Sequence, residues 1–210
     1  MAMASLLEAP RLVVNQKAKL VELTNQYLIR DPEGNELGHV QQEGQSKLKK
    51  VLRFTTDIDQ FNTHTLGVYD AGGAQVLELT RPRKLVKSRL NVKAGDGRTV
   101  GQIVQDNVFG KIRFNFVGVN DELLGRIKAE NWRAWDFSIV DATDHEVGRI
   151  DKNFVGVAKA IFTTGDNYIV DISHEAQGDL RLMALAAAVA VDTALKQDAR
   201  GFSVTDALDI

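Results

Sequence analysis

Residues Leu182–Val191, LMALAAAVAV, carry no polar side chain. A helix that is apolar on every side has to be surrounded by protein or by lipid. A membrane-spanning helix needs about 20 apolar residues, and charged residues stand at both ends of this shorter run, Arg181 and Asp192. The run therefore predicts a helix, over about residues 179–198, that is buried inside a protein domain. A strained single-pass membrane anchor is the alternative that the pattern leaves open.

The chain before this run repeats one pattern of apolar and polar residues five times. In each copy, alternating apolar residues lead through a turn with Asp, Gly or Asn to an apolar residue, a glycine, any residue and an aliphatic one. Such alternation buries one face of a strand, and Gly or Asn suits a tight turn, so each copy predicts a β-hairpin. The copies are Tyr27–Val40, Leu66–Leu79 (where Leu77 or its neighbour replaces the glycine), Leu90–Ile103, Phe114–Ile127 and Phe137–Ile150.

Consecutive hairpins form a large antiparallel sheet, whose open edges favour aggregation unless the sheet closes into a barrel. A barrel of ten or more strands encloses a lumen wider than its own side chains fill. The apolar helix is the element that would fill this lumen. The pattern therefore predicts a mainly β protein, a closed antiparallel β-barrel around a buried hydrophobic C-terminal helix.

Four segments between Leu12 and Lys196 carry a resemblance to a known family. They read LVVNQKAKLVELTNQYLIRD, LELTRPRK, LNVKAGDGRTVGQIVQD and IFTTGDNYIVDI. In order and spacing they resemble the phospholipid scramblase-related proteins, which share the tubby-like fold with the plant LURP-one-related proteins. The resemblance implies a barrel of about twelve strands and phospholipid scrambling as the activity. The Pro-rich N-terminal region and the cysteine cluster of eukaryotic scramblases have no counterpart in this chain.

The composition is that of one domain, since 210 residues with 44% hydrophobic residues suit one large core. We expect the barrel domain over residues 12–200, with tails at 1–11 and 201–210. The absence of cysteine excludes disulfides, thiolate nucleophiles and Cys-ligated metal centres. The N-terminus lacks the basic and apolar regions of a signal peptide. We therefore expect a cytoplasmic protein, and lipid binding would imply peripheral attachment at the inner face of the plasma membrane.

Basic residues are concentrated in two segments, although the net charge of the chain is −2. In strand geometry Lys87, Arg89 and Lys93 share one face, and such clusters bind anionic lipid headgroups at about 1 kcal/mol per basic residue. The alternative is a pair of solvated strand faces that protect a sheet edge. Nucleic acid is not favoured as a partner, because no stacking aromatic residue lies between Arg81 and Lys93. The candidate lipid-binding residues are Arg81, Arg83, Lys84, Lys87, Arg89 and Lys93 in the first segment and Lys47, Lys49 and Lys50 in the second.

Residues 165–171 lie where the scramblase family has its proposed calcium motif. Asp166, Asn167 and Asp171 offer side-chain oxygens there, and Ca²⁺ takes about six to eight oxygen ligands. These three residues are the predicted metal ligands, and calcium is the one cofactor that the sequence suggests. An Asx-type turn leading into a strand explains the same residues equally well.

Catalysis is not indicated by the sequence. The four histidines are scattered, and none has the H-E-x-x-H spacing of a zinc site. Because no nucleophile, base and orienting group form a set, we expect a protein that is not an enzyme. Two functions remain: a lipid-associated module that docks anionic phospholipid headgroups, and a soluble scaffold that binds another protein.

Overall fold

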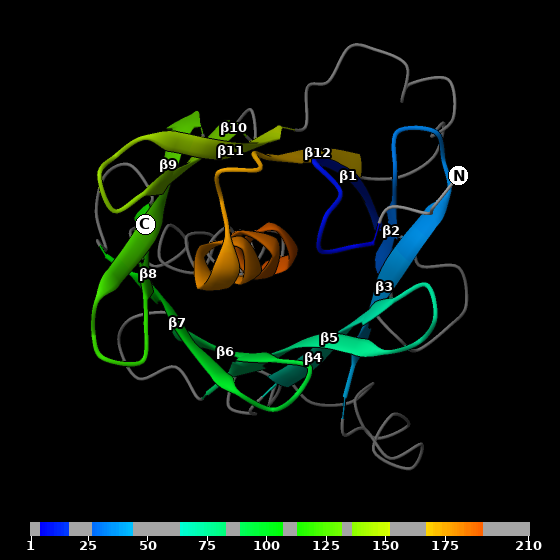
Figure 1. Ribbon diagram of the computed structural model, residues 1–210, viewed down its shortest axis with the longest axis horizontal. Helices are drawn as coiled ribbons and strands as arrows, with labels where there is room; N and C mark the ends of the chain where they lie inside the picture. Colours follow the sequence, from blue (N-terminus) through cyan, green and yellow to red (C-terminus); the bar gives the residue numbers. More distant parts are fainter. Residues whose placement is uncertain are drawn as a thin grey trace, which may run out of the picture.

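Residues 182–190 of the apolar run lie in a helix at the centre of a ring of strands (Figure 1). The computed structural model describes residues 5–16, 27–43, 64–82, 89–106, 113–131, 136–151 and 167–190. Within these ranges the helix occupies residues 178–190, and twelve strands surround it. The strands are β1 (Arg11–Gln16), β2 (Tyr27–Arg30), β3 (Glu36–Gln42), β4 (His64–Asp70), β5 (Gln75–Arg81), β6 (Arg89–Ala94), β7 (Thr99–Gln105), β8 (Arg113–Val117), β9 (Leu123–Asn131), β10 (Asp136–Asp141), β11 (Glu146–Asp151) and β12 (Asn167–Ile172).

The strands form one closed antiparallel barrel in which each strand pairs with its neighbours in sequence. Five hairpins, β2–β3, β4–β5, β6–β7, β8–β9 and β10–β11, coincide with the five sequence repeats, so the predicted hairpins and barrel are confirmed. The closing contact is different in kind, because β1 pairs with β12 from the other end of the chain, with Val14 opposite Tyr168. No short turn joins these two strands, and this pairing removes both edges of the sheet.

Every hairpin contains a register shift at the same place, and the repeat glycine pairs with the residue just before the shift. These pairs are Ile29 with Gly38, Val92 with Gly101, Phe116 with Gly125 and Ile139 with Gly148. A Cβ atom on Gly148 would lie 2.6 Å from the carbonyl oxygen of Asp171 on the neighbouring strand β12, and one on Gly125 would lie 2.4 Å from that of Val140 on the next hairpin. Glycine is therefore required by the close approach of neighbouring hairpins at these positions.

Two of these glycines also leave room for the central helix. A Cβ atom on Gly101 would lie 2.7 Å from Met183, and one on Gly125 would lie 2.9 Å from Leu180. The β4–β5 hairpin is the exception, since Leu77 stands opposite Val68 at the equivalent place. There the close approach is provided by Gly95 after β6, whose added Cβ atom would overlap the carbonyl oxygen of Gln75.

The central helix is buried on every side. All residues from Met183 to Val189 are at most 2% exposed, and they pack with the inward side chains of the barrel in one hydrophobic core. Tyr168 of β12 donates a hydrogen bond from its hydroxyl to the carbonyl oxygen of Ala188, at 3.0 Å. The prediction of a helix buried in protein is confirmed. Within the described ranges, no helix is long and apolar enough to span a membrane.

The chain before β1 packs against one end of the helix. Leu6 and Ala9 are buried in the core. The guanidinium of Arg181 donates hydrogen bonds to the carbonyl oxygens of Leu7, Ala9 (2.8 Å) and Ser173 (3.2 Å), and burial lowers its pKa. Three backbone carbonyl groups thus compensate the partly buried cation. Part of the segment predicted as an N-terminal tail is therefore joined to the barrel.

We expect Ala188→Leu to destabilise the protein by about 1–3 kcal/mol, because the larger side chain would overpack a lumen that is already filled. Ala71→Leu is the matched control, since Ala71 is exposed in the β4–β5 turn and surface changes cost within about 0.5 kcal/mol. Chemical denaturation of both variants measures the difference. Equal unfolding midpoints would contradict the burial of the helix.

We expect Gly125→Ala to lower the free energy of unfolding by about 1–3 kcal/mol, because a methyl group there would press on the backbone of Val140 and on Leu180. Gly72→Ala is the control, because its nearest neighbour, at 3.3 Å, is the side-chain carboxylate of Asp70, which can move. Thermal unfolding of the two variants should separate them clearly. A Gly125→Ala variant as stable as the control would show that hairpin contact does not require the glycine.

Candidate functional site

Strand β6 presents the described part of the basic segment to the outside of the barrel. Val92 is fully buried, and Leu90 and Ala94 pack against the core. Arg89 and Lys93, which alternate with these inward residues along the strand, are exposed. Because successive side chains of a strand point to opposite faces, both cations lie on the outer wall of the barrel.

The basic residues of this segment do not all share that face. In β5, Leu77 and Leu79 are fully buried on the inner face of the sheet. Arg81 is two residues further along the strand, so it lies on the same inner face, at the strand end. Lys93 forms an ion pair with Glu78 of β5 at 3.3 Å. The remaining candidates, Arg83, Lys84, Lys87, Lys47, Lys49 and Lys50, lie outside the described residues. Arg89 and Lys93 are therefore the described members of an outer basic surface, which we call the β6 face.

A second group of cations, which the sequence did not single out, lies across the outer wall from β8 to β1. Strand register places four cations in one line with a serine and an aspartate, each residue opposite the next: Arg113, Lys128, Ser138, Arg149, Asp171 and Arg11. Arg149 directly follows the repeat glycine, as Arg126 does in the preceding hairpin. This position directly after the repeat glycine is the sequence signal that could have identified Arg126 and Arg149. Only the strand register shows that the cations are neighbours.

Acidic side chains neutralise most of these cations and the nearby Arg126. Arg126 and Lys128 both donate to one carboxylate oxygen of Asp144, at 2.7 and 2.8 Å. The hydrogen bond from Lys128 and the positive charges of both residues lower the pKa of Asp144. Asp144 lies at φ 68° in the β10–β11 turn, a conformation that Asp tolerates better than most residues. The turn thus carries the anion that pairs with two cations of β9.

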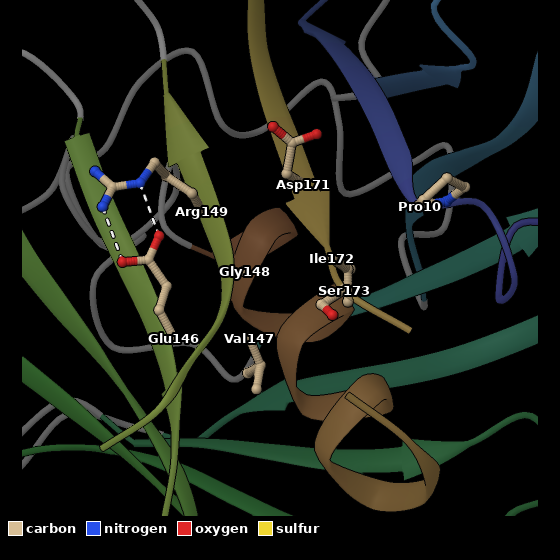
Figure 2. A pocket seen from close by; sticks show the side chains of 8 residues that line it. All are labelled: Pro10, Glu146, Val147, Gly148, Arg149, Asp171, Ile172 and Ser173. Carbon is tan, nitrogen blue, oxygen red and sulfur yellow. Dashed lines mark hydrogen bonds and ion pairs between the residues drawn. The ribbon is translucent and has the colours of Figure 1, made fainter. Parts of the chain in front are cut away.

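A shallow depression of about 440 Å³ lies where β11, β12 and the start of β1 meet (Figure 2). Arg149 turns towards Glu146 there, with its Nη2 and Nε atoms 2.9 and 3.0 Å from the carboxylate oxygens. A further nitrogen of Arg149 lies 2.7 Å from Asp136. Asp171, also in the lining, accepts hydrogen bonds from Arg11 at 2.5 and 3.1 Å. The charged side chains that line this depression are therefore already paired, Arg149 with Glu146 and Asp136, and Asp171 with Arg11.

The depression contains one of the three predicted calcium ligands. Asp171 is held by Arg11, and Asn167 lies on β12 opposite Asn15. Asp166 lies outside the described residues. Within the ranges that the structure describes, no three His, Cys, Asp or Glu side chains are grouped to hold a metal ion. Calcium binding by Asp166, Asn167 and Asp171 stays a prediction.

Comparison with known proteins identifies the family. The family described as Scramblase matches residues 1–195. The chain belongs to the scramblase family. A phospholipid scramblase family protein of Schizosaccharomyces pombe is 25% identical over 183 residues, and altered inheritance rate of mitochondria protein 25 of Saccharomyces cerevisiae is 20% identical over 196 residues. These alignments cover 80% and 79% of the chain but only 47% and 59% of the two relatives.

The barrel is shared with a solved structure. The X-ray structure of a protein from Arabidopsis thaliana matches with a TM-score of 0.52 and 13% identity, over 88% of this scramblase-family chain and 93% of that chain. At this identity the likeness concerns the fold alone. The predicted family and the predicted tubby-like barrel are both confirmed.

We expect Asp144→Asn to weaken the acid sensitivity of this scramblase-family protein. Because the folded pKa of Asp144 is lowered, its ion pairs stabilise the fold above the unfolded pKa, and this stabilisation is lost as the pH falls through the folded pKa. Urea unfolding from neutral pH down to about pH 2 measures the effect. Asp121→Asn is the matched control, since Asp121 lies at φ 60° in the β8–β9 turn. Equal pH profiles of the two variants would contradict the expectation.

Proposed function

We propose that this scramblase-family protein is a non-enzymatic, lipid-associated module that docks anionic phospholipid headgroups through its basic segment. Phospholipid scrambling is the activity that the family implies, and the name of the S. pombe relative agrees with it. The proposal extends to a cytoplasmic location with peripheral attachment at the inner face of the plasma membrane. The observation that carries it is the exposure of Arg89 and Lys93 on the outer wall of a barrel whose core is closed.

The β6 face suits a charged surface better than a small ligand. Its cations stand on the outer, convex wall of a closed barrel. Arg89 begins β6, and Arg83, Lys84 and Lys87 precede it closely in sequence. A headgroup layer can contact all cations on such a wall, at about 1 kcal/mol for each.

Glu78 moderates the positive charge of the β6 face. The side chains of Lys93 and Glu78 are 48% and 34% exposed, and an ion pair so accessible to water is worth about 0–1 kcal/mol. An anionic headgroup can therefore compete with Glu78 for Lys93 at low cost. Removal of the Glu78 charge should strengthen lipid binding.

Flotation with vesicles of equal parts phosphatidylcholine and phosphatidylserine tests the proposal. We expect binding at low salt, loss of binding as salt rises, and no binding to phosphatidylcholine alone. Arg89→Glu should weaken binding about 5-fold or more, given about 1 kcal/mol per basic residue. Glu78→Gln should strengthen it by a similar factor.

Two variants control for chemistry other than local charge. Arg89→Lys keeps the positive charge and should retain binding. Glu33→Gln changes the net charge as Glu78→Gln does, but at the exposed turn between β2 and β3, and should leave binding unchanged. Wild-type protein that does not float would favour the alternative of a protein-interaction scaffold. An Arg89→Glu variant that binds normally would exclude the β6 face. Transfer of labelled lipid between leaflets of reconstituted vesicles tests scrambling separately.

A further inference from the structure

The outer wall of β3 and β4 carries a pair of aromatic rings. His39 and Tyr69 stand opposite each other on the two strands, and their rings stack with centroids 5.4 Å apart and planes inclined by 14°. Val40 and Val68, their neighbours along the strands, are fully buried. Because side chains alternate along a strand, both rings lie on the outside of the barrel. Neither ring belongs to the hydrophobic core.

Gly67 provides the space that the Tyr69 ring occupies. A Cβ atom added to Gly67 would lie 2.6 Å from Cε2 of Tyr69 and 2.6 Å from Oε1 of Glu43. The ring therefore extends over the glycine, and its hydroxyl donates a hydrogen bond of 2.5 Å to that same oxygen of Glu43. The amide of Gln41 donates a second one to it, at 3.3 Å. Tyr69 and Glu43 thus form one ordered group, which we call the Tyr69 site.

The Tyr69 site is electrostatically negative. The hydrogen bond to Glu43 raises the pKa of Tyr69, and partial burial and the negative charges of Glu43 and Glu78 raise it further. The phenol is therefore uncharged at neutral pH, and its ring keeps the negative face of an aromatic quadrupole. Such a face attracts ammonium groups, and a neighbouring carboxylate adds to the attraction. The site is thus suited to a cation rather than to a phosphate.

A cation of the β6 face lies close to this negative site. Strand register places Glu78 opposite Gly67, and Lys93 opposite Glu78. Neighbouring strands are about 4.8 Å apart, so Gly67 and Lys93 are separated by roughly 10 Å of wall. Lys93 reaches back towards β5, since its Nζ atom lies 3.3 Å from Glu78. The wall therefore offers a cation site and an anion site at a separation suited to one small zwitterionic group.

We propose that Tyr69 and Glu43 bind the ammonium group of a zwitterionic phospholipid headgroup whose phosphate contacts Lys93. The ring contributes cation–π attraction and Glu43 contributes its charge, whereas Lys93 pairs with the phosphate. This site deepens the proposed lipid binding and rests on it. The β6 face attracts the protein to an anionic surface, and the Tyr69 site then favours surfaces that also contain ammonium-bearing lipids.

The expected contribution of the Tyr69 site is modest. A cation–π contact at an exposed position raises affinity about 2- to 5-fold. This is too little to hold the protein on phosphatidylcholine alone, where the basic residues find no net negative charge. The site should therefore act as a selector among anionic membranes and not as an independent anchor.

Flotation with two kinds of vesicle of equal charge tests the site. Half of the lipid in both is phosphatidylglycerol, which is anionic and has no ammonium group. The other half is phosphatidylcholine in one kind and digalactosyldiacylglycerol, a neutral lipid without an ammonium group, in the other. We expect the wild-type protein to bind the vesicles with phosphatidylcholine about 5-fold more tightly, the factor that corresponds to about 1 kcal/mol.

Four variants assign this preference to the Tyr69 site. Tyr69→Leu removes the aromatic face and Glu43→Gln removes the charge, so each should reduce the ratio of the two affinities about 2-fold or more. Tyr69→Phe keeps the ring and should keep the ratio. Glu33→Gln changes the net charge as Glu43→Gln does, but at the exposed turn between β2 and β3, and should also keep it.

The outcomes separate the site from the proposed function. Equal binding of the wild-type protein to both kinds of vesicle would overturn the ammonium site, while lipid binding survives. A preference that persists in Tyr69→Leu and Glu43→Gln would also overturn it, because another surface would then recognise the choline group. If Tyr69→Leu does not fold, the wild-type comparison and Glu43→Gln still decide. Absence of flotation with either composition would instead remove the proposed function, and the ammonium site with it.

Discussion

The structure depends on the filling of a barrel lumen by a helix of small apolar side chains. A sheet that closes on itself loses its edges, but twelve strands enclose more space than their inward side chains occupy. The helix occupies that space with Ala184, Ala186, Ala187 and Ala188 among larger neighbours, and all four are at most 2% exposed. Empty space there would forfeit the dispersion contacts that close packing provides.

The repeat glycines connect this filling to the wall of the barrel. Gly101 and Gly125 lie between the carbonyl groups of a neighbouring strand and the side chains of Met183 and Leu180. A single Cβ atom at either position would disturb the strand contact and the helix contact together. Wall and helix therefore fit only as a unit, and this leaves the outer wall and the turns as the places where charge can vary. The β6 face belongs to that outer shell.

The outcome of the sequence predictions follows from how local each feature is. The five hairpins were predictable because alternation, turn and glycine lie within about fifteen residues of each other. The pairing of β1 with β12 was not, because no turn connects strands from opposite ends of the chain. Arg81 and Arg89 appear as one basic segment in the sequence, yet they lie on opposite sides of the sheet, since the alternation restarts in each strand. The line of cations from Arg113 to Arg11 depends on the register of several strand pairs.

The sequence by itself determined the hairpins, the need for a filled barrel and the burial of the apolar helix, because periodicity and hydrophobicity act over short stretches of chain. Only the tertiary structure decided which strands close the barrel and which charged groups meet. Asp144 between Arg126 and Lys128, and Asp171 beside Arg11, are neighbours because strand register brings them together. Charge acts through space over several ångströms, so its arrangement is known only when residues distant in the chain have been placed.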